Sequence, residues 1–330
     1  MNIHKTIVYT KEIYEKANKA NKELLKDYLV ELKSKKRKPN TLEQYLSDGR
    51  MLICYVANEM ENKSFLDFNK KDFRQVSLWL TEDRQVSNAR FNRVFALIHG
   101  MMEYAEDEED YEYEKNYARK IKNLPKEPVK KITFLTDIQI SKIRGYLLEH
   151  KMYRECAYLD ISYDSAARIN EVIQMKKQDL VDNRYSNTVV GKRGKQFNLI
   201  IHDHSIESLR LYLEQRGEDH KEELWVSVRR KDHKVVGKQA AYEWTKKMCK
   251  ILTELEGKPI TFSPHCFRHS ALENYENGTH YMCRVLAEPK KFSLEELRVL
   301  AHHDSMDTTK SYLKPKENNV IEGMFGVKIS

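Results

Sequence analysis

The chain has 330 residues, of which 40% are hydrophobic and 33% are charged, enough for two domains that each bury a core. Its formal net charge of +8 is compatible with a nucleic-acid partner but does not require one. Five cysteines without a CxxC pair argue against a disulfide framework and a zinc ribbon. Neither a signal-peptide core nor an apolar stretch of about 18 residues is present, so we expect a protein of the cytoplasm.

The first part of the chain has the apolar spacing of amphipathic helices. Residues 1–20 are polar and are predicted to form an N-terminal extension. After them, apolar side chains recur at helical intervals in four segments, residues 21–32, 41–60, 71–80 and 87–104. A basic run and Pro39 separate the first two helices, and Asn40 or Thr41 is expected to cap the second. Residues 21–125 are therefore predicted to form a small all-helical domain.

An acidic tract and a linker follow these helices. The tract from Glu106 to Glu114 would repel a phosphate backbone, so we expect it on the outer surface or against a neighbouring subunit. The next stretch contains Pro125, Pro128 and several lysines, a composition typical of a linker. We place the interdomain linker at residues 126–133.

The second predicted domain, residues 134–317, is mainly helical with a small β-hairpin, an α+β fold. Thr136 is expected to cap its first helix, and an apolar segment at 152–163 leads into the sequence AARINE. Alternating apolar residues from Val189 to Ile201 around a GKRG turn predict the hairpin. Further helices are predicted at 206–216 and 240–255, and Trp225 between them is expected in the core.

Six residues in this domain suit chemistry on a phosphate. In chain order they are Arg168, Lys192, His265, Arg268, His303 and Tyr312. A phenol can attack phosphorus, two guanidiniums can grip its oxygens, and histidine and lysine can move protons. Because these side chains supply the positive charge and the proton transfers, the reaction needs no metal ion, and no cofactor is expected. His265 and His269 have the spacing of zinc ligands on a helix, but Cys266 stands where a metalloprotease needs glutamate.

This ordered series resembles the active-site series of the tyrosine recombinases, the phage-integrase and Xer class. The resemblance covers residues 130–315 well and residues 20–125 loosely. It implies two domains that close around DNA as a C-shaped clamp, and a homo-tetramer on two recombination sites. The tail, residues 318–330, is expected to dock on a neighbouring subunit. The first 20 residues are too short for the extra arm-binding domain of some phage integrases.

The resemblance also implies a role for each residue. Tyr312 would attack a phosphodiester and keep the 3′ phosphate, while Arg168 and Arg268 bind the scissile phosphate. Lys192, with Lys195 as the rival, would protonate the leaving 5′ oxygen. His265 would assist proton transfer and His303 would hydrogen-bond the phosphate. We choose His303 over its neighbour His302 because Thr308, Thr309 and Tyr312 then fall in the usual register.

Two departures from the family pattern are visible. Ala301 and His302 stand where leucine and glycine are usual. The interval from Arg268 to His303 is longer than in compact members, and we expect an added loop between Glu273 and Lys291.

Contacts with DNA outside the active site are predicted on the helical domain. The candidates for phosphate contact are Lys35, Lys36, Arg37, Lys38, Arg90 and Arg93. A basic run beside a helix end is also common as a solvated face.

The function expected from these observations is a site-specific DNA recombinase that integrates or excises a mobile element and works in the cytoplasm with the nucleoid. The alternatives are an Xer-like resolvase of chromosome dimers, a type IB topoisomerase and a helical DNA-binding protein without catalysis. The sequence names neither the DNA site nor any accessory factor.

Overall fold

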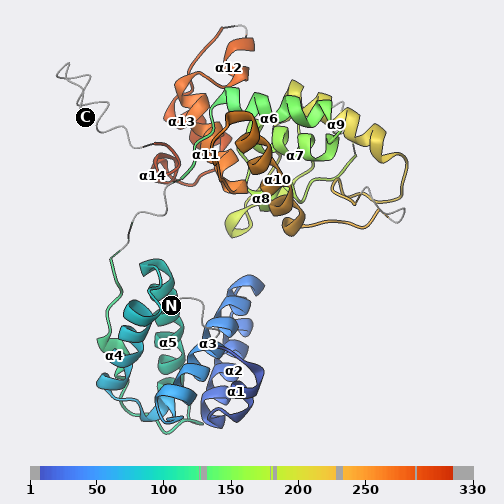
Figure 1. Cartoon of the computed structure of the whole chain (residues 1–330). Helices are drawn as coiled ribbons and strands as arrows, with labels where there is room; N and C mark the ends of the chain where they lie inside the picture. The colour runs from blue at the N-terminus through green and yellow to red at the C-terminus, as the bar shows by residue number, and fades with distance from the viewer. Residues whose placement is uncertain are drawn as a thin grey trace, which may run out of the picture. The chain divides into compact units, whose positions relative to one another are not determined.

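The computed structural model describes residues 8–125, 127, 132–178, 180, 184–227, 233–286 and 288–314. The chain falls into two compact units, Met1–Val129 and Lys130–Ser330, each with its own hydrophobic core (Figure 1). Among the described residues, no helix has the length and apolar character needed to cross a membrane. The expected tail at 318–330 lies outside the described residues.

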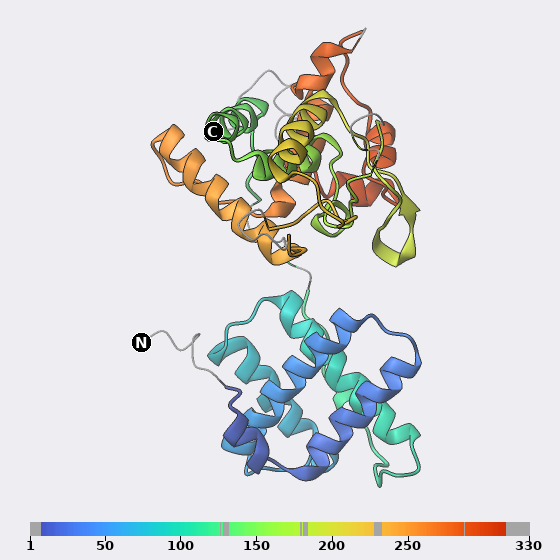
Figure 2. The same cartoon turned by 90° about the vertical axis from the view of Figure 1, so that its right-hand side faces the viewer.

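The first unit is all helical. Its α-helices are α1 (Lys11–Lys16), α2 (Lys19–Ser34), α3 (Pro39–Glu59), α4 (Lys70–Leu78) and α5 (Asn88–Asp107). Short 3-10 turns cover Phe65–Asp67 and Ala118–Lys120, and a π-helical turn covers Trp79–Asp83. The long helices α2, α3 and α5 pack against one another (Figure 2) and enclose aromatic residues such as Phe91 and Phe95. Helices occupy all four segments in which periodicity predicted them.

The helix starts in this unit are set by local capping. The Ser87 hydroxyl accepts from the backbone N–H of Arg90 and so begins α5. The prediction that Asn40 or Thr41 caps α3 was wrong, because Lys38 is the cap residue and Pro39 occupies the first turn. Proline has its backbone torsion already set for a helix and lacks the N–H that would be unpaired there.

The acidic tract continues from the end of α5. The Tyr111 hydroxyl donates to the Asp27 carboxylate at 2.8 Å, and the Tyr113 ring is buried. Arg119 pairs with Glu106 at 2.7 Å. The tyrosines therefore attach this tract to its own unit, while Glu108 to Asp110 are exposed.

Over its described residues, the second unit is mainly helical, with one hairpin and three isolated β-bridges. Its α-helices are α6 (Asp137–Glu149), α7 (Tyr153–Asp164), α8 (Ile169–Val172), α9 (Asp203–Arg216), α10 (Lys238–Glu256), α11 (Pro264–Asn277), α12 (Tyr281–Val285), α13 (Leu294–Leu300) and α14 (Met306–Lys310). Strands β1 (Val189–Val190) and β2 (Gln196–Phe197) pair antiparallel, with Val189 opposite Phe197. Thr136 caps α6 in a capping box with Gln139, as predicted.

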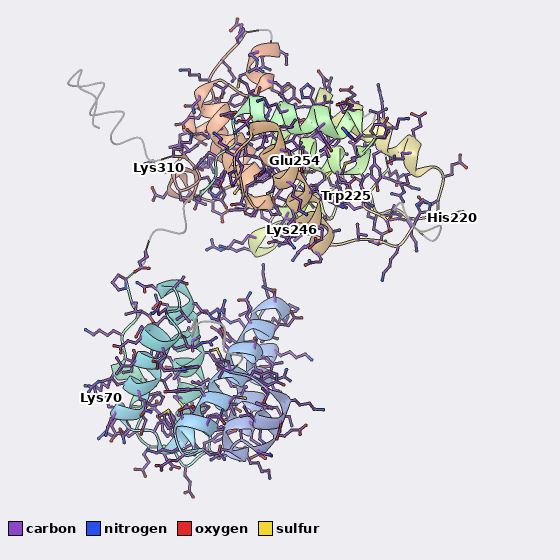
Figure 3. All side chains as sticks on the ribbon, viewed as in Figure 1. Lys70, His220, Trp225, Lys246, Glu254 and Lys310 are labelled. Atoms are coloured by element: carbon purple, nitrogen blue, oxygen red, sulfur yellow. The ribbon has the colours of Figure 1, made fainter. Side chains whose placement is uncertain are left out.

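The centre of this unit is α7, in which ten consecutive residues from Glu155 to Asp164 are buried. Trp225 is buried as predicted, and its indole N–H donates to the Val172 carbonyl at 2.7 Å. Figure 3 labels Trp225 together with the exposed Lys246, Glu254 and Lys310. A buried α7 ends at the turn that carries Arg168, so the core fixes the position of that turn.

The prediction of an added loop from Glu273 to Lys291 was wrong for its first residues, which belong to a helix. Helix α11 continues to Asn277, Gly278 ends it with a φ of 73°, and α12 follows at Tyr281. Glu273 is buried. Because residues such as Glu273 are buried, α11 extends two turns past Arg268. The extra length between Arg268 and His303 therefore holds the end of α11 and the short helix α12.

Candidate active site

Arg168 is positioned by a glutamate one turn later. It is the N-cap residue of α8, and its backbone N–H donates to Glu171 Oε2 at 2.7 Å. Its guanidinium donates to Glu171 Oε1 at 3.0 Å. Glu171 is buried and Arg168 is largely so, at 22% side-chain exposure. A charge-assisted pair in this setting holds the guanidinium in one orientation.

Arg268 projects from α11 into the core of the unit and is fully buried. Its guanidinium donates to the carbonyl of Ala166 at 2.5 Å and to that of Ala301 at 2.7 Å. Glu171 Oε2 lies 4.0 Å away. Burial, together with the charge of Arg168, lowers the pKa of Arg268 to about 10, so the group stays cationic at neutral pH. Two cations thus share one carboxylate, which leaves net positive charge for an anion.

His303 faces this pair. Its Nε2 lies 2.6 Å from Arg268 Nη2, which can only donate, so Nε2 accepts and the proton sits on Nδ1. The Nδ1–H then donates to Thr309 Oγ1 at 3.0 Å. Burial and the charges of Arg268 and Arg168 lower the pKa of His303 to about 3. The imidazole is therefore neutral and locked in one tautomer.

His302 points elsewhere. Its ring stacks on Phe197 of β2, with 3.7 Å between the centroids. Its φ of 52° lies in the left-handed region, which glycine adopts most easily. His302 therefore holds a backbone conformation that glycine would adopt more easily, and only His303 is turned toward the arginines.

Tyr312 follows α14 and lies against three of the predicted residues. Its ring centroid is 5.0 Å from Arg268 Cζ, 4.8 Å from the ring of His303 and 5.2 Å from the ring of His265. His265 is exposed at the start of α11. One chain therefore brings together the phenol, both guanidiniums and both imidazoles of the predicted series.

Lys192 is not part of this cluster. It is exposed at the hairpin turn, where its carbonyl accepts from the Lys195 backbone N–H, and its side chain makes no hydrogen bond or ion pair with any described residue. The adjacent Gly191 is close to the site, because a Cβ there would lie 3.2 Å from Glu171 Oε1. The rival Lys195 lies 3.5 Å from the His302 carbonyl and 3.7 Å from Asp304. The hairpin thus starts beside the site, and Lys192 lies exposed at its turn.

Sequence reasoning missed the parts played by two further residues. The sequence pointed to His269 only through its zinc-like spacing from His265, but its Nδ1 donates to the Tyr312 carbonyl at 2.9 Å. Thr309 was used only to align the sequence with the family pattern, yet its hydroxyl oxygen accepts from Nδ1–H of His303 and so supports that tautomer. The position of His269 directly after Arg268 was visible in the sequence, but its partner was not.

The predicted DNA contacts of the first unit differ in their surroundings. Lys36, Arg37 and Lys38 are exposed between α2 and α3, whereas Lys35 pairs with Glu31 at 2.7 Å. On α5, Arg93 donates to the buried Asp48 at 2.7 Å, and Arg90 lies 3.7 Å from it. These two arginines are held by a carboxylate of their own unit.

The described part of the chain contains no group of three or more His, Cys, Asp or Glu side chains arranged to hold a metal ion. His265 and His269, at the spacing of zinc ligands, pack edge to face with 4.9 Å between their centroids. We find no third ligand beside them among the described residues.

Comparison with known proteins gives consistent matches. The model of the "Phage integrase family" matches residues 133–319. The SPbeta prophage-derived recombinase-like protein YomM of Bacillus subtilis (strain 168) is 25% identical over 317 residues, covering 91% of this chain and 89% of YomM. The putative tyrosine recombinase TTE1313 of Caldanaerobacter subterraneus subsp. tengcongensis is 24% identical over 260 residues, covering 76% of this chain and 84% of that protein.

Two solved structures share the fold. A lambda integrase tetramer bound to a Holliday junction has a TM-score of 0.65 at 16% identity, covering 89% of this chain and 77% of that one. The Tn1549 transposon integrase in complex with transposon right end DNA also has a TM-score of 0.65, at 11% identity, covering 92% and 98%.

Proposed function

This chain belongs to the phage integrase family and is a tyrosine recombinase, and we propose that it breaks and rejoins double-stranded DNA with Tyr312 as the nucleophile. The observation that carries the assignment is the position of the Tyr312 ring, 5.0 Å from the guanidinium carbon of the buried Arg268 and 4.8 Å from the ring of His303. A phenol beside a fixed cation is placed to meet a phosphate that the same cation binds.

The reaction then follows from the residues. Arg168 and Arg268 bind the non-bridging oxygens of the scissile phosphate. The Tyr312 oxygen attacks phosphorus, and the bond between phosphorus and the 5′ oxygen breaks. His265, exposed beside Tyr312, assists removal of the phenolic proton. The 3′-phosphotyrosine conserves the bond energy, and a 5′ hydroxyl from the partner duplex reverses the step.

His303 has a more defined task in this scheme than the sequence suggested. Its Nε2 accepts from Arg268 in the DNA-free protein, so it first holds that guanidinium. It can donate to a phosphate oxygen only once Nε2 carries a proton, and a bound phosphate would favour that protonated form. His303 therefore couples phosphate binding to its own charge.

Lys192 supplies the proton to the leaving 5′ oxygen after the hairpin moves. Its exposed position keeps the general acid away from the site until DNA is present, and Gly191 beside Glu171 marks where the hairpin approaches. Lys195 remains the rival.

We propose a mobile element as the biological context. The similarity to a prophage-derived recombinase-like protein over 91% of the chain favours this over an Xer-like resolvase. The assembly we propose is a homo-tetramer on two DNA sites, in which the two units of each subunit form a C-shaped clamp and residues 318–330 dock on a neighbour. The lambda integrase tetramer on a Holliday junction supports the tetramer in this proposal. The protein would act in the cytoplasm with the nucleoid.

The test is to trap the covalent intermediate. Wild type, Tyr312→Phe and the matched control Tyr185→Phe, at an exposed tyrosine, are incubated with nicked DNA from the flanks of the gene. We expect an SDS-resistant adduct with wild type and the control, and none with Tyr312→Phe. Specific binding without an adduct in any of the three would favour the non-catalytic DNA-binding protein. Relaxation of any supercoiled plasmid, without a preferred site, would favour the topoisomerase.

A further inference from the structure

The segment that carries Tyr312 is attached to α11 by two side chains one helical turn apart. His269 Nδ1 donates to the Tyr312 carbonyl at 2.9 Å, and Glu273 Oε2 accepts from the backbone N–H of Lys314 at 2.9 Å. Both side chains belong to buried residues, each 5% exposed. Residues four apart lie on the same face of a helix, so the two contacts form a continuous attachment.

The His269 ring also supports the Tyr312 ring directly. The two rings stack with 4.5 Å between centroids and an interplanar angle of 24°. Arg268, the preceding residue of α11, has its Cζ 5.0 Å from the same tyrosine ring. Helix α11 therefore contacts both the backbone and the ring of Tyr312 while it supplies the cation for the phosphate.

This attachment is needed because α14 gives Tyr312 little support. The helix has five residues, Met306–Lys310, and a helix this short is not stable without tertiary contacts. The Tyr312 N–H donates to the Thr309 carbonyl at the end of α14. Among the described residues, His269 and Glu273 then provide the hydrogen bonds that join Tyr312 and Lys314 to α11.

We propose that His269 and Glu273 are positioning residues that hold the Tyr312 segment against α11, so that the phenol stays aligned with the phosphate bound by Arg268. Neither residue is assigned a proton transfer or a contact with DNA. The proposal rests on the proposed function, since it concerns the same nucleophile.

The experiment uses the full chain and two pairs of variants. His269→Asn keeps an N–H donor near the position of Nδ1, whereas His269→Leu removes it. Glu273→Gln keeps an acceptor for Lys314, whereas Glu273→Ala removes it. Three quantities are measured: the single-turnover rate of adduct formation on nicked DNA, the DNA affinity, and the hydrogen exchange of a peptide covering residues 306–314 without DNA.

We expect His269→Leu to slow adduct formation by about 10- to 100-fold, the range for a nucleophile misplaced by about 1 Å. DNA affinity should be unchanged, and exchange in residues 306–314 should rise. His269→Asn should recover most of the rate because it restores the donor. Glu273→Ala should raise exchange in the same peptide, and Glu273→Gln should not.

A wild-type rate in His269→Leu would overturn the proposal, and so would a loss of rate that only follows a loss of DNA affinity. If His269→Leu fails to fold, the Glu273 pair decides, and unchanged exchange in Glu273→Ala rejects the attachment. Absence of an adduct in wild type would refute the proposed function instead. The exchange measurement separates the two failures, because it requires no DNA.

Discussion

At the scale of single residues, the site is a buried set of charges with an excess of cations. Burying a guanidinium is costly unless its donors are paired, and both terminal nitrogens of Arg268 have partners while its Nε has none among the described residues. Glu171 is the carboxylate that Arg168 and Arg268 share. The unpaired Nε and the excess positive charge are features that a bound phosphate would satisfy.

The neutral state of His303 predicts a pH dependence of folding. Its pKa is about 3 in the folded protein and near 6.5 when unfolded, so between these values the unfolded chain binds the extra proton. Stability is therefore lost as the pH falls. His303→Gln should remove about 1 kcal/mol of the loss between about pH 7 and about pH 5.5.

Urea unfolding of the second unit within the full chain, at the two pH values, measures this difference in the free energy of unfolding. The control is His220→Gln, at an exposed histidine labelled in Figure 3, which should leave the pH dependence as in wild type. An equal loss of stability in wild type and His303→Gln would mean that His303 is not held neutral by its surroundings.

At the scale of elements, the hairpin carries the exposed Lys192 and Lys195, and the turn between α2 and α3 carries the exposed Lys36, Arg37 and Lys38. The β1–β2 hairpin has only two residues in each strand, and Arg193 in its turn has a φ of 61°. So short a hairpin can change position at low cost. The turn before α3 is likewise exposed, whereas the arginines of α5 pair with Asp48.

The hairpin predicts how Lys192 and Lys195 differ. Lys192→Ala should slow cleavage by about 100-fold or more, the size of a lost general acid, while Lys195→Ala should act weakly. DNA with a bridging sulfur at the leaving 5′ position should restore cleavage by Lys192→Ala, because a thiolate leaves without a proton. The reverse pattern, with only Lys195→Ala slow and restored by sulfur, would identify Lys195 as the acid.

The basic turn predicts a salt-dependent share of DNA affinity. Replacing Lys36, Arg37 and Lys38 by alanine should weaken DNA binding. It should also reduce the slope of log affinity against log salt concentration by as much as about 3. Binding titrations at several salt concentrations measure the slope. Alanine at Lys11 and Lys16, exposed on α1, is the control. An unchanged slope would show that the turn is only a solvated surface.

At the scale of the whole molecule, the candidate residues other than Lys192 cluster within the second unit of one chain. Arg168, Arg268 and Tyr312 belong to the second unit, and α11 links the last two through direct contacts. A subunit therefore contains both the proposed nucleophile and the proposed phosphate clamp. This arrangement predicts cleavage in cis.

Mixing two inactive variants tests that prediction. Arg268→Ala lacks the clamp and Tyr312→Phe lacks the nucleophile, so a mixture should form no more adduct on nicked DNA than either variant alone. The control for mixed assembly is to dilute wild type with Tyr312→Phe. A change in the activity per wild-type subunit would show that the two proteins form mixed assemblies. Adduct in the mixture of inactive variants, at a level near that of wild type, would show that the tyrosine acts in trans.

The amino-acid sequence by itself determined most of the longer helices, the cap at Thr136, the hairpin and the order of the reactive residues. These features depend on local periodicity, on side chains such as Thr136 and Ser87 that cap their own helix, and on residue types that suit a phosphate. Glu171 stands three residues after Arg168, within one turn, so this pair too was visible in the sequence.

Only the tertiary structure decided which side chains meet. It turned His303 toward Arg268 and His302 toward Phe197, joined His269 to Tyr312 across 43 residues and extended α11 past Glu273. These outcomes depend on packing between segments far apart in the chain, and neighbours such as His302 and His303 have nearly identical local patterns. The backbone turn at His302 and the burial around Arg268 distinguish them, and both arise only once the core of the unit has formed.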